Sequence, residues 1–161
     1  MSIVIIGAGY VGLPLAISFS KKFNVLCYDI SKKRVENLKK GIDQNKQHSK
    51  KEIRNKKLHF TNKVNEIANK KYFIITVPTP INKENHPDLS YLERSTIEVA
   101  KFISKGSIII YESTTYPGCT DEICIPLLEG NSKLSHNKDF FVAYSPERVN
   151  PGDKIHTLQT I

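Results

Sequence analysis

A glycine-rich segment near the amino terminus has the residue types and spacing that bind a dinucleotide phosphate. Gly7, Gly9 and Gly12 form the pattern GxGxxG directly after the apolar run 3–6. The first glycine permits a tight turn, the second lets the backbone approach a pyrophosphate, and the third lets the next helix pack closely. Free N–H groups and the dipole at the start of that helix favour the phosphate charge. The pattern therefore predicts a pyrophosphate site.

An acidic residue follows at the distance expected for ribose recognition. Asp29 comes 22 residues after Gly7, at the end of the second apolar segment. Its carboxylate would accept a hydrogen bond from an adenosine ribose hydroxyl and would repel a 2′-phosphate, which favours NAD over NADP. Lys32, Lys33 and Arg34 keep NADP as the alternative, because a nearby cation can accommodate the 2′-phosphate.

The elements that must position these residues alternate along the chain between apolar runs and amphipathic stretches. The predicted strands are residues 3–6, 24–28, 58–61, 72–77, 107–111 and 140–144. The predicted helices are residues 11–21, 32–40, 64–68, 89–103 and 117–128, with 42–57 as a loop or short helix. This alternation predicts an α/β fold in one domain, residues 1–161, with a Rossmann-like doubly wound parallel sheet of about six strands.

The composition is that of a globular domain. The chain has 161 residues, of which 39% are hydrophobic and 25% charged. The sequence shows neither an apolar run near the roughly 18 residues of a membrane span nor a signal peptide, so we expect a cytoplasmic protein without membrane insertion. The three cysteines lack CxxC spacing, and we predict neither a metal site nor a disulfide framework.

The chain is basic, with 24 Lys and Arg against 16 Asp and Glu and a net charge of +8. Much of the excess lies in residues 32–40 and 46–57, which carry neither interleaved aromatic residues nor a nucleic-acid-binding motif. We therefore expect a solvated lysine-rich surface and no nucleic-acid partner. Binding of DNA or RNA by residues 46–57 stays the alternative, with salt-dependent retention as its test.

Four motifs occur in order and carry a resemblance to a known family. They are GAGYVGLPLA (7–16), VPTP (77–80), ESTTYPGCT (112–120) and YSPERVNPGDK (144–154). Together they resemble the N-terminal NAD-binding domain of the UDP-glucose/GDP-mannose dehydrogenase family over nearly the whole chain. The last motif is most similar to the branch that acts on UDP-N-acetylhexosamines. The UDP-glucose branch has a PEFLxEG-like segment there, and Pro151 occupies the position of its second glutamate.

The resemblance implies an oxidoreductase that converts the C6 alcohol of a UDP-sugar to a carboxylate in two NAD-dependent steps. In the family a cysteine holds the aldehyde and then a thioester, and the products enter bacterial capsule or other surface polysaccharides. Two alternatives stay open. One is another NAD-dependent dehydrogenase, of the hydroxyacid, UDP-glucose or 6-phosphogluconate type. The other is a stand-alone dinucleotide-binding module without catalysis.

The resemblance also implies roles for residues along the cofactor. Gly7, Gly9 and Gly12 would form the phosphate loop, in which Tyr10 and Val11 supply backbone contacts to the pyrophosphate. Asp29 would bind ribose, with Arg34 beside the adenosine end. Thr79 would face the cofactor at the end of the fourth strand.

Further positions matched by the resemblance lie toward the reacting atoms. Thr114 would lie near the nicotinamide and help to position a catalytic water. Glu147 is the candidate general base of thioester hydrolysis, since a threonine hydroxyl and a glutamate can hold and deprotonate a water. Arg148 and Val149 resemble substrate-contacting positions.

The nucleophilic cysteine of the family has no counterpart in these residues. It belongs to a downstream GFGGxC-like motif, and the family's central dimerising helix and C-terminal domain are likewise absent here. We therefore expect this chain to bind NAD without turnover, and the parent protein to be a homodimer through the missing regions. Cys119 lies in a helix first turn, which favours a thiolate, but the family does not use that position. With Cys27 and Cys124, it is expected to be a packing residue.

Overall fold

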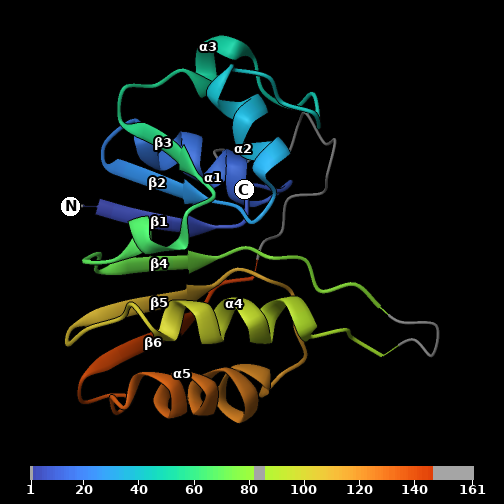
Figure 1. Cartoon of the computed structure of the whole chain (residues 1–161). Coiled ribbons are helices and arrows are strands. Elements are labelled where there is room, and N and C mark those ends of the chain that lie inside the picture. Colours follow the sequence, from blue (N-terminus) through green and yellow to red (C-terminus); the bar gives the residue numbers. More distant parts are fainter. Residues whose placement is uncertain (1, 82–85, 147–161) are drawn as a thin grey trace.

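The fold is a six-stranded parallel sheet. The computed structural model describes residues 2–81 and 86–146. Its strands are β1 (Ser2–Ile6), β2 (Asn24–Tyr28), β3 (Leu58–Thr61), β4 (Tyr72–Ile75), β5 (Ser107–Tyr111) and β6 (Phe140–Tyr144). Every pairing is parallel, in the order β3-β2-β1-β4-β5-β6 (Figure 1). This confirms the predicted Rossmann-like doubly wound sheet.

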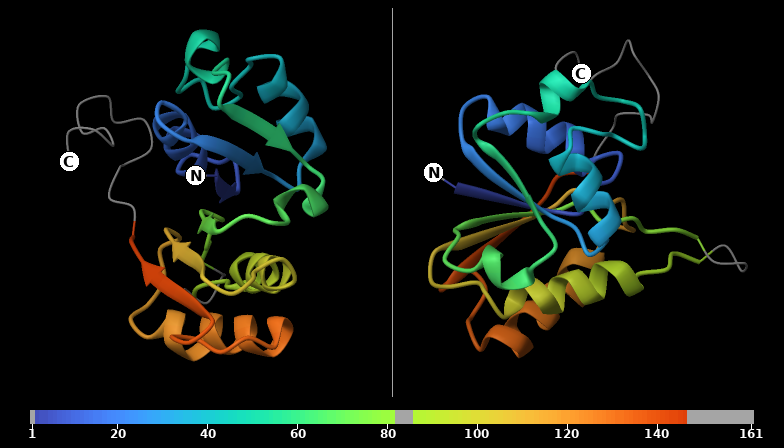
Figure 2. Two further views of the ribbon diagram at one scale, coloured as in Figure 1. Left: turned by 90° about the vertical axis from the view of Figure 1, so that its left-hand side faces the viewer. Right: turned by 45° about the horizontal axis from the view of Figure 1, so that its top comes forward.

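Helices cover both faces of the sheet. On one face lie α1 (Gly12–Ser20), α2 (Lys32–Lys39) and α3 (Lys50–Ile53), and on the other lie α4 (Ser90–Ala100) and α5 (Ile125–Ser132) (Figures 1 and 2). The alternation of strand side chains explains the two cores. In β1, Ile3 and Ile5 pack with the first group of helices, and Val4 and Ile6 with the second. A strand buried on both faces needs such a continuous apolar run.

Two serines fix helix starts in the first half of the chain. The Ser31 hydroxyl accepts a hydrogen bond from the Arg34 N–H at 3.2 Å, which caps α2 as predicted. Ser49 and Glu52 form a reciprocal capping box that starts α3. The segment 42–57, predicted as a loop or short helix, therefore contains one short helix that Ser49 positions.

The structure differs from the predicted bounds by more than one residue at three elements. β4 ends at Ile75 rather than Val77, and α4 ends at Ala100 rather than Ile103. The helix predicted over 117–128 is wrong as one element: it is a π-helix, η2 (Thr120–Cys124), followed by α5. Pro126 lies in the first turn of α5 and has no N–H to donate to the preceding turn, which suits a break of regular α geometry at this point.

The connection from β3 to β4 carries the chain to the other side of β1. It passes through η1 (Val64–Ile67), a 3-10 helix where a short helix over 64–68 was predicted, and Ile67 packs in the second core. The chain order therefore reverses between β1 and β4, and such a switch point opens a crevice at the carboxyl ends of the strands. Within residues 2–81 and 86–146, the helices are all too short or too polar to cross a bilayer.

Candidate functional site

The glycine loop lies at the switch point, between β1 and α1. Gly7 has φ +100°, a left-handed conformation that favours glycine. A Cβ at Gly12 would lie 1.9 Å from the Gly7 carbonyl oxygen, whereas a Cβ at Gly9 would meet no atom within 4 Å. This geometry agrees with the three predicted tasks of a turn, an open approach and close helix packing.

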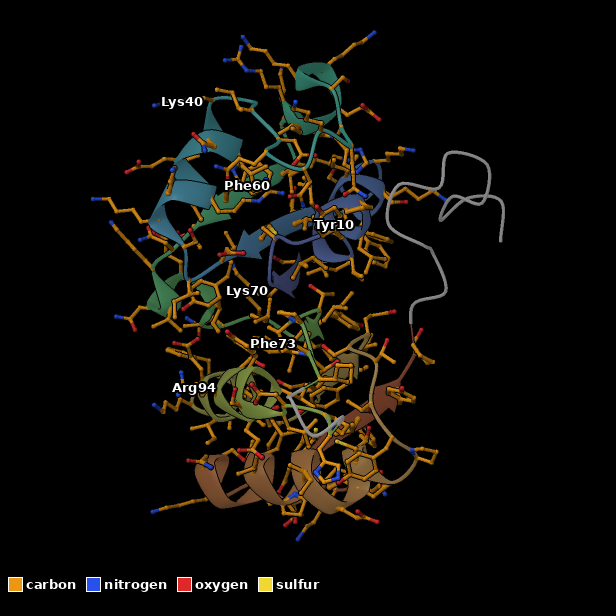
Figure 3. The ribbon with its side chains drawn as sticks, turned by 90° about the vertical axis from the view of Figure 1, so that its right-hand side faces the viewer. Tyr10, Lys40, Phe60, Lys70, Phe73 and Arg94 are labelled. Carbon is orange, nitrogen blue, oxygen red and sulfur yellow. The ribbon has the colours of Figure 1, made fainter. Side chains whose placement is uncertain are left out.

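The loop also offers donors to an anion. Among the described residues, the N–H groups of Tyr10 and Val11 have no hydrogen-bond acceptor, and the first turn of α1 contains no acidic residue. Figure 3 views the edge toward which the strand arrows of Figure 1 point, and Tyr10 lies there beside the start of α1. Open space at Gly9, free N–H groups and a helix start are the features that fit a pyrophosphate.

Thr76 holds this loop through contacts that were not predicted from the sequence. Its backbone N–H and its hydroxyl both donate to the Ile6 carbonyl, each at 2.9 Å, and the hydroxyl lies 3.0 Å from the Gly7 carbonyl oxygen. Thr76 is buried, and its Oγ1 would lie 2.4 Å from a Cβ at Gly12. The sequence signal for Thr76 was a threonine directly after the apolar run 72–75, which forms the strand that pairs with β1.

Asp29 lies where the sequence places the ribose site, at the carboxyl end of β2. Its Oδ2 accepts the Ala8 N–H and its Oδ1 accepts the Ser31 N–H, both at 2.8 Å. A carboxylate oxygen accepts more than one hydrogen bond, so both oxygens keep capacity for a ribose hydroxyl. The two bonds orient the carboxylate beside the glycine loop.

Arg34 extends from α2 toward the same loop. Its Nε donates to the Ala8 carbonyl oxygen at 2.9 Å, and its Nη1 lies 2.8 Å from Oδ1 of Asp43. Only 10% of the Arg34 side chain and 1% of the Asp43 side chain are exposed. Arg34 is therefore a buried support of the loop in this structure, and its predicted contact with the adenosine end stays a prediction.

Two predicted site residues, in the loops after β4 and β5, meet at the carboxyl ends of the strands. The Thr79 hydroxyl donates to the Thr114 carbonyl oxygen at 2.5 Å. Beside them the buried Ser113 hydroxyl donates to the Val77 carbonyl oxygen at 2.7 Å, and the Thr115 N–H donates to the Tyr144 hydroxyl at 3.3 Å. The loops after β4 and β5 and the end of β6 are thereby joined beside the switch point.

Three predicted site residues cannot be placed. Glu147, Arg148 and Val149 lie outside the described residues, which end two positions after Tyr144 at residue 146. Their predicted roles as general base and substrate contacts therefore stay predictions.

The cysteines are buried free thiols, as expected of packing residues. Burial raises the pKa of Cys27, Cys119 and Cys124, the last to about 12, so each thiol stays protonated near neutral pH. At Cys119 burial therefore outweighs the thiolate-stabilising effect expected of a helix start. In the part of the chain that the structure describes, no three His, Cys, Asp or Glu side chains gather as metal ligands would.

Comparisons with known proteins agree on one family. The NAD-binding domain of the UDP-glucose/GDP-mannose dehydrogenase family matches residues 1–161. The whole chain is 48% identical to a UDP-N-acetyl-D-glucosamine 6-dehydrogenase of Salmonella typhi and 44% identical to one of Pseudomonas aeruginosa, covering 38% of each. The chain thus spans about two fifths of the length of these curated relatives.

Solved structures give the same result. A UDP-D-ManNAc dehydrogenase from Pyrococcus horikoshii is 37% identical with a TM-score of 0.88, over 94% of this chain and 37% of that one. A GDP-mannose dehydrogenase from Pseudomonas aeruginosa is 25% identical with a TM-score of 0.87, over 94% of this chain and 37% of that one. In both proteins the similarity extends over less than two fifths of the chain.

Proposed function

Because the chain belongs to the UDP-glucose/GDP-mannose dehydrogenase family and is its NAD-binding domain, we propose that it is the cofactor-binding part of a UDP-N-acetylhexosamine 6-dehydrogenase. The identity of 48% and 44% to two UDP-N-acetyl-D-glucosamine 6-dehydrogenases carries the substrate class. The UDP-N-acetyl-D-mannosamine dehydrogenases are less similar, at 29–38% identity. The substrate is therefore a UDP-N-acetylhexosamine, with the glucosamine form favoured.

The proposed reaction oxidises the C6 alcohol to a carboxylate with two NAD and one water. The alcohol becomes an aldehyde and then an acid, and two NADH and three protons are released at neutral pH. Bound NAD supplies the hydride acceptor in each oxidation. In the proposed site, the N–H groups of Tyr10 and Val11 bind the pyrophosphate and Asp29 binds ribose hydroxyls while its charge repels a 2′-phosphate.

The threonine pair lies toward the end of the cofactor where the sugar would react. Thr79 and Thr114 occupy neighbouring loops beside the switch point, where ligands bind in this fold. We keep the predicted roles here: Thr114 orients a water, Glu147 removes a proton from it, and Arg148 and Val149 contact the sugar nucleotide. An arginine suits the diphosphate of such a substrate.

The setting of the reaction follows from the same family. A relative that is 44% identical over 99% of this chain is named CapL, from Staphylococcus aureus, which supports a place in surface polysaccharide synthesis. We place the enzyme in the cytoplasm, where UDP-sugars are available, and we propose a homodimer formed through regions beyond these residues.

The test is an oxidation assay on the protein that carries these residues. Purified protein is incubated with NAD and, in separate reactions, UDP-N-acetylglucosamine, UDP-N-acetylmannosamine, UDP-glucose and 6-phosphogluconate, while NADH absorbance is followed. Two NADH per sugar with a UDP-N-acetylhexosamine would confirm the proposal. Oxidation of UDP-glucose or 6-phosphogluconate alone would overturn it in favour of another dehydrogenase type. In the whole protein that contains these residues, NAD binding without any oxidation would favour a binding module, whereas residues 1–161 alone are expected to bind NAD without turnover.

A further inference from the structure

Asp43 is a buried acidic residue that the proposed cofactor site does not yet use. It follows the end of α2, and its carboxylate accepts three backbone hydrogen bonds from its own loop. The donors are the N–H groups of Asn45, Gln47 and His48, at 3.1, 2.9 and 3.2 Å. Burial raises the pKa of Asp43, but the bonds from Arg34 and from the backbone N–H groups of Gln47 and Asn45 outweigh it and hold the pKa below its usual value. The group is therefore a fixed negative charge.

That charge is connected to the glycine loop through one residue, Arg34. Oδ1 of Asp43 pairs with Nη1 of Arg34 at 2.8 Å, and Nε of Arg34 donates to the Ala8 carbonyl oxygen at 2.9 Å. The Ala8 N–H donates to Asp29 at 2.8 Å. Both peptide groups of Ala8 are thus held by charged side chains, immediately before Gly9. The orientation of the next N–H groups depends on that anchoring.

The same contacts decide what else Arg34 can bind. Its charge is neutralised by Asp43, and its side chain is nine-tenths buried against the loop. An arginine at this place in the fold can instead reach outward to the 2′-phosphate of NADP. Lys32 and Lys33 are exposed at the start of α2, and they stay available whatever Asp43 does.

We propose that Asp43 is a positioning and specificity-determining residue for NAD, acting through Arg34. It holds the guanidinium inward on the Ala8 carbonyl, which orders the phosphate loop and withholds the positive charge from a 2′-phosphate. This inference rests on the proposed cofactor site. Asp43, in the loop after α2, never touches the cofactor. It would nevertheless contribute part of the affinity for NAD and part of the discrimination against NADP.

The experiment measures NAD and NADP dissociation constants of the chain by calorimetry for wild type, Asp43→Asn and a matched control, Asp139→Asn. Asp139 also accepts a backbone N–H of its loop, from Ser135 at 3.1 Å, and pairs with Lys105 at 3.3 Å. It directly precedes β6 and so lies at the amino ends of the strands, whereas the glycine loop lies at their carboxyl ends. The control therefore removes an ion pair and a carboxylate contact with the backbone far from the site, although Lys105 is exposed.

We expect Asp43→Asn to raise the Kd for NAD about tenfold, the change expected from one charge-assisted hydrogen bond held less well. The ratio of the Kd for NADP to that for NAD should fall by about threefold or more, because freed Arg34 attracts the 2′-phosphate. Asp139→Asn should leave both constants within about twofold of wild type. A general loss of stability would weaken the binding of both dinucleotides alike and would leave the ratio of the two dissociation constants unchanged.

A second variant covers the case in which Asp43→Asn does not fold. Arg34→Lys keeps a positive charge beside Asp43 but removes the Nε donor to Ala8. It should raise the Kd for NAD by a similar factor. In the double variant the two effects should not multiply, because both break one chain of contacts. Unchanged affinities and ratio in folded Asp43→Asn, or multiplying effects, would overturn the inference. Wild-type affinity in Arg34→Lys would do the same. Failure of the wild-type chain itself to bind NAD would instead overturn the proposed cofactor site.

Discussion

The two halves of the site are held in place by different kinds of contact. On the side of β1 and β2, charged and buried groups fix the glycine loop: Asp29 and Arg34 grip Ala8. On the side of β4 and β5, neutral hydrogen bonds join the loops, among them the exposed bond between Thr79 and Thr114. Charge-assisted hydrogen bonds are roughly twice as strong as neutral ones. From this difference we expect cofactor affinity to depend mainly on the first half, and orientation of the reacting end on the second.

The largest effect should come from Gly12→Ala. The new Cβ would lie 1.9 Å from the Gly7 carbonyl oxygen and 2.4 Å from Oγ1 of Thr76, so α1 must move away from β1. We expect a loss of about 2–4 kcal/mol in the free energy of unfolding and loss of NAD binding. Urea unfolding and calorimetry measure both. Gly130→Ala, in α5 with open space at its Cβ, is the control and should be neutral or stabilising.

Gly9→Val separates binding from folding within the same loop. No atom lies within 4 Å of a Cβ at Gly9, so the free energy of unfolding should change by less than about 1 kcal/mol. The side chain would occupy the space of the pyrophosphate, and the Kd for NAD should rise by more than about tenfold. A folded variant with wild-type affinity would show that the phosphate does not approach Gly9.

A pair of threonine substitutions compares the buried contact that holds the glycine loop with the exposed contact that joins the loops after β4 and β5. Thr76→Val removes the buried hydroxyl that bonds to Ile6, and it should cost about 1–2 kcal/mol of stability and weaken NAD binding. Thr79→Val removes an exposed neutral bond and should cost about 0.5 kcal/mol, with a two- to threefold change in Kd. Denaturant unfolding with calorimetry measures both variants. Equal losses at the two positions would contradict the comparison.

The smallest expected effect is a pH dependence of the stability that Asp43 contributes in the first half. Because the folded-state pKa of Asp43 is lowered, its contribution to stability is present above the pKa of the unfolded chain, about 3.9. It is lost as the pH falls through the folded-state pKa. Between about pH 6 and pH 3, the free energy of unfolding measured with urea should therefore decline less steeply in Asp43→Asn than in wild type. Parallel curves would show that the carboxylate is not stabilised by Arg34.

The sequence predicted the sheet and the glycine loop because both depend on local patterns. Four of the six strands have the predicted bounds, since buried parallel strands are continuous apolar runs bounded by turn residues. Thr76 and Asp43 could not be found in this way. Thr76 acts on Ile6, 70 residues away, and Asp43 acts through Arg34 on Ala8. Contacts between distant segments leave no periodic signal.

The most direct test of the central claim is an NMR titration of the 15N-labelled chain with NAD. If the glycine loop holds the pyrophosphate, the amide resonances of residues 7–12 and Ser31 should shift, followed by those of residues 113–115. The amides of residues 55–57 and Lys105, at the opposite edge of the sheet, should stay unmoved. Saturation by NAD without shifts in residues 7–12, or with the main shifts at that opposite edge, would contradict the account.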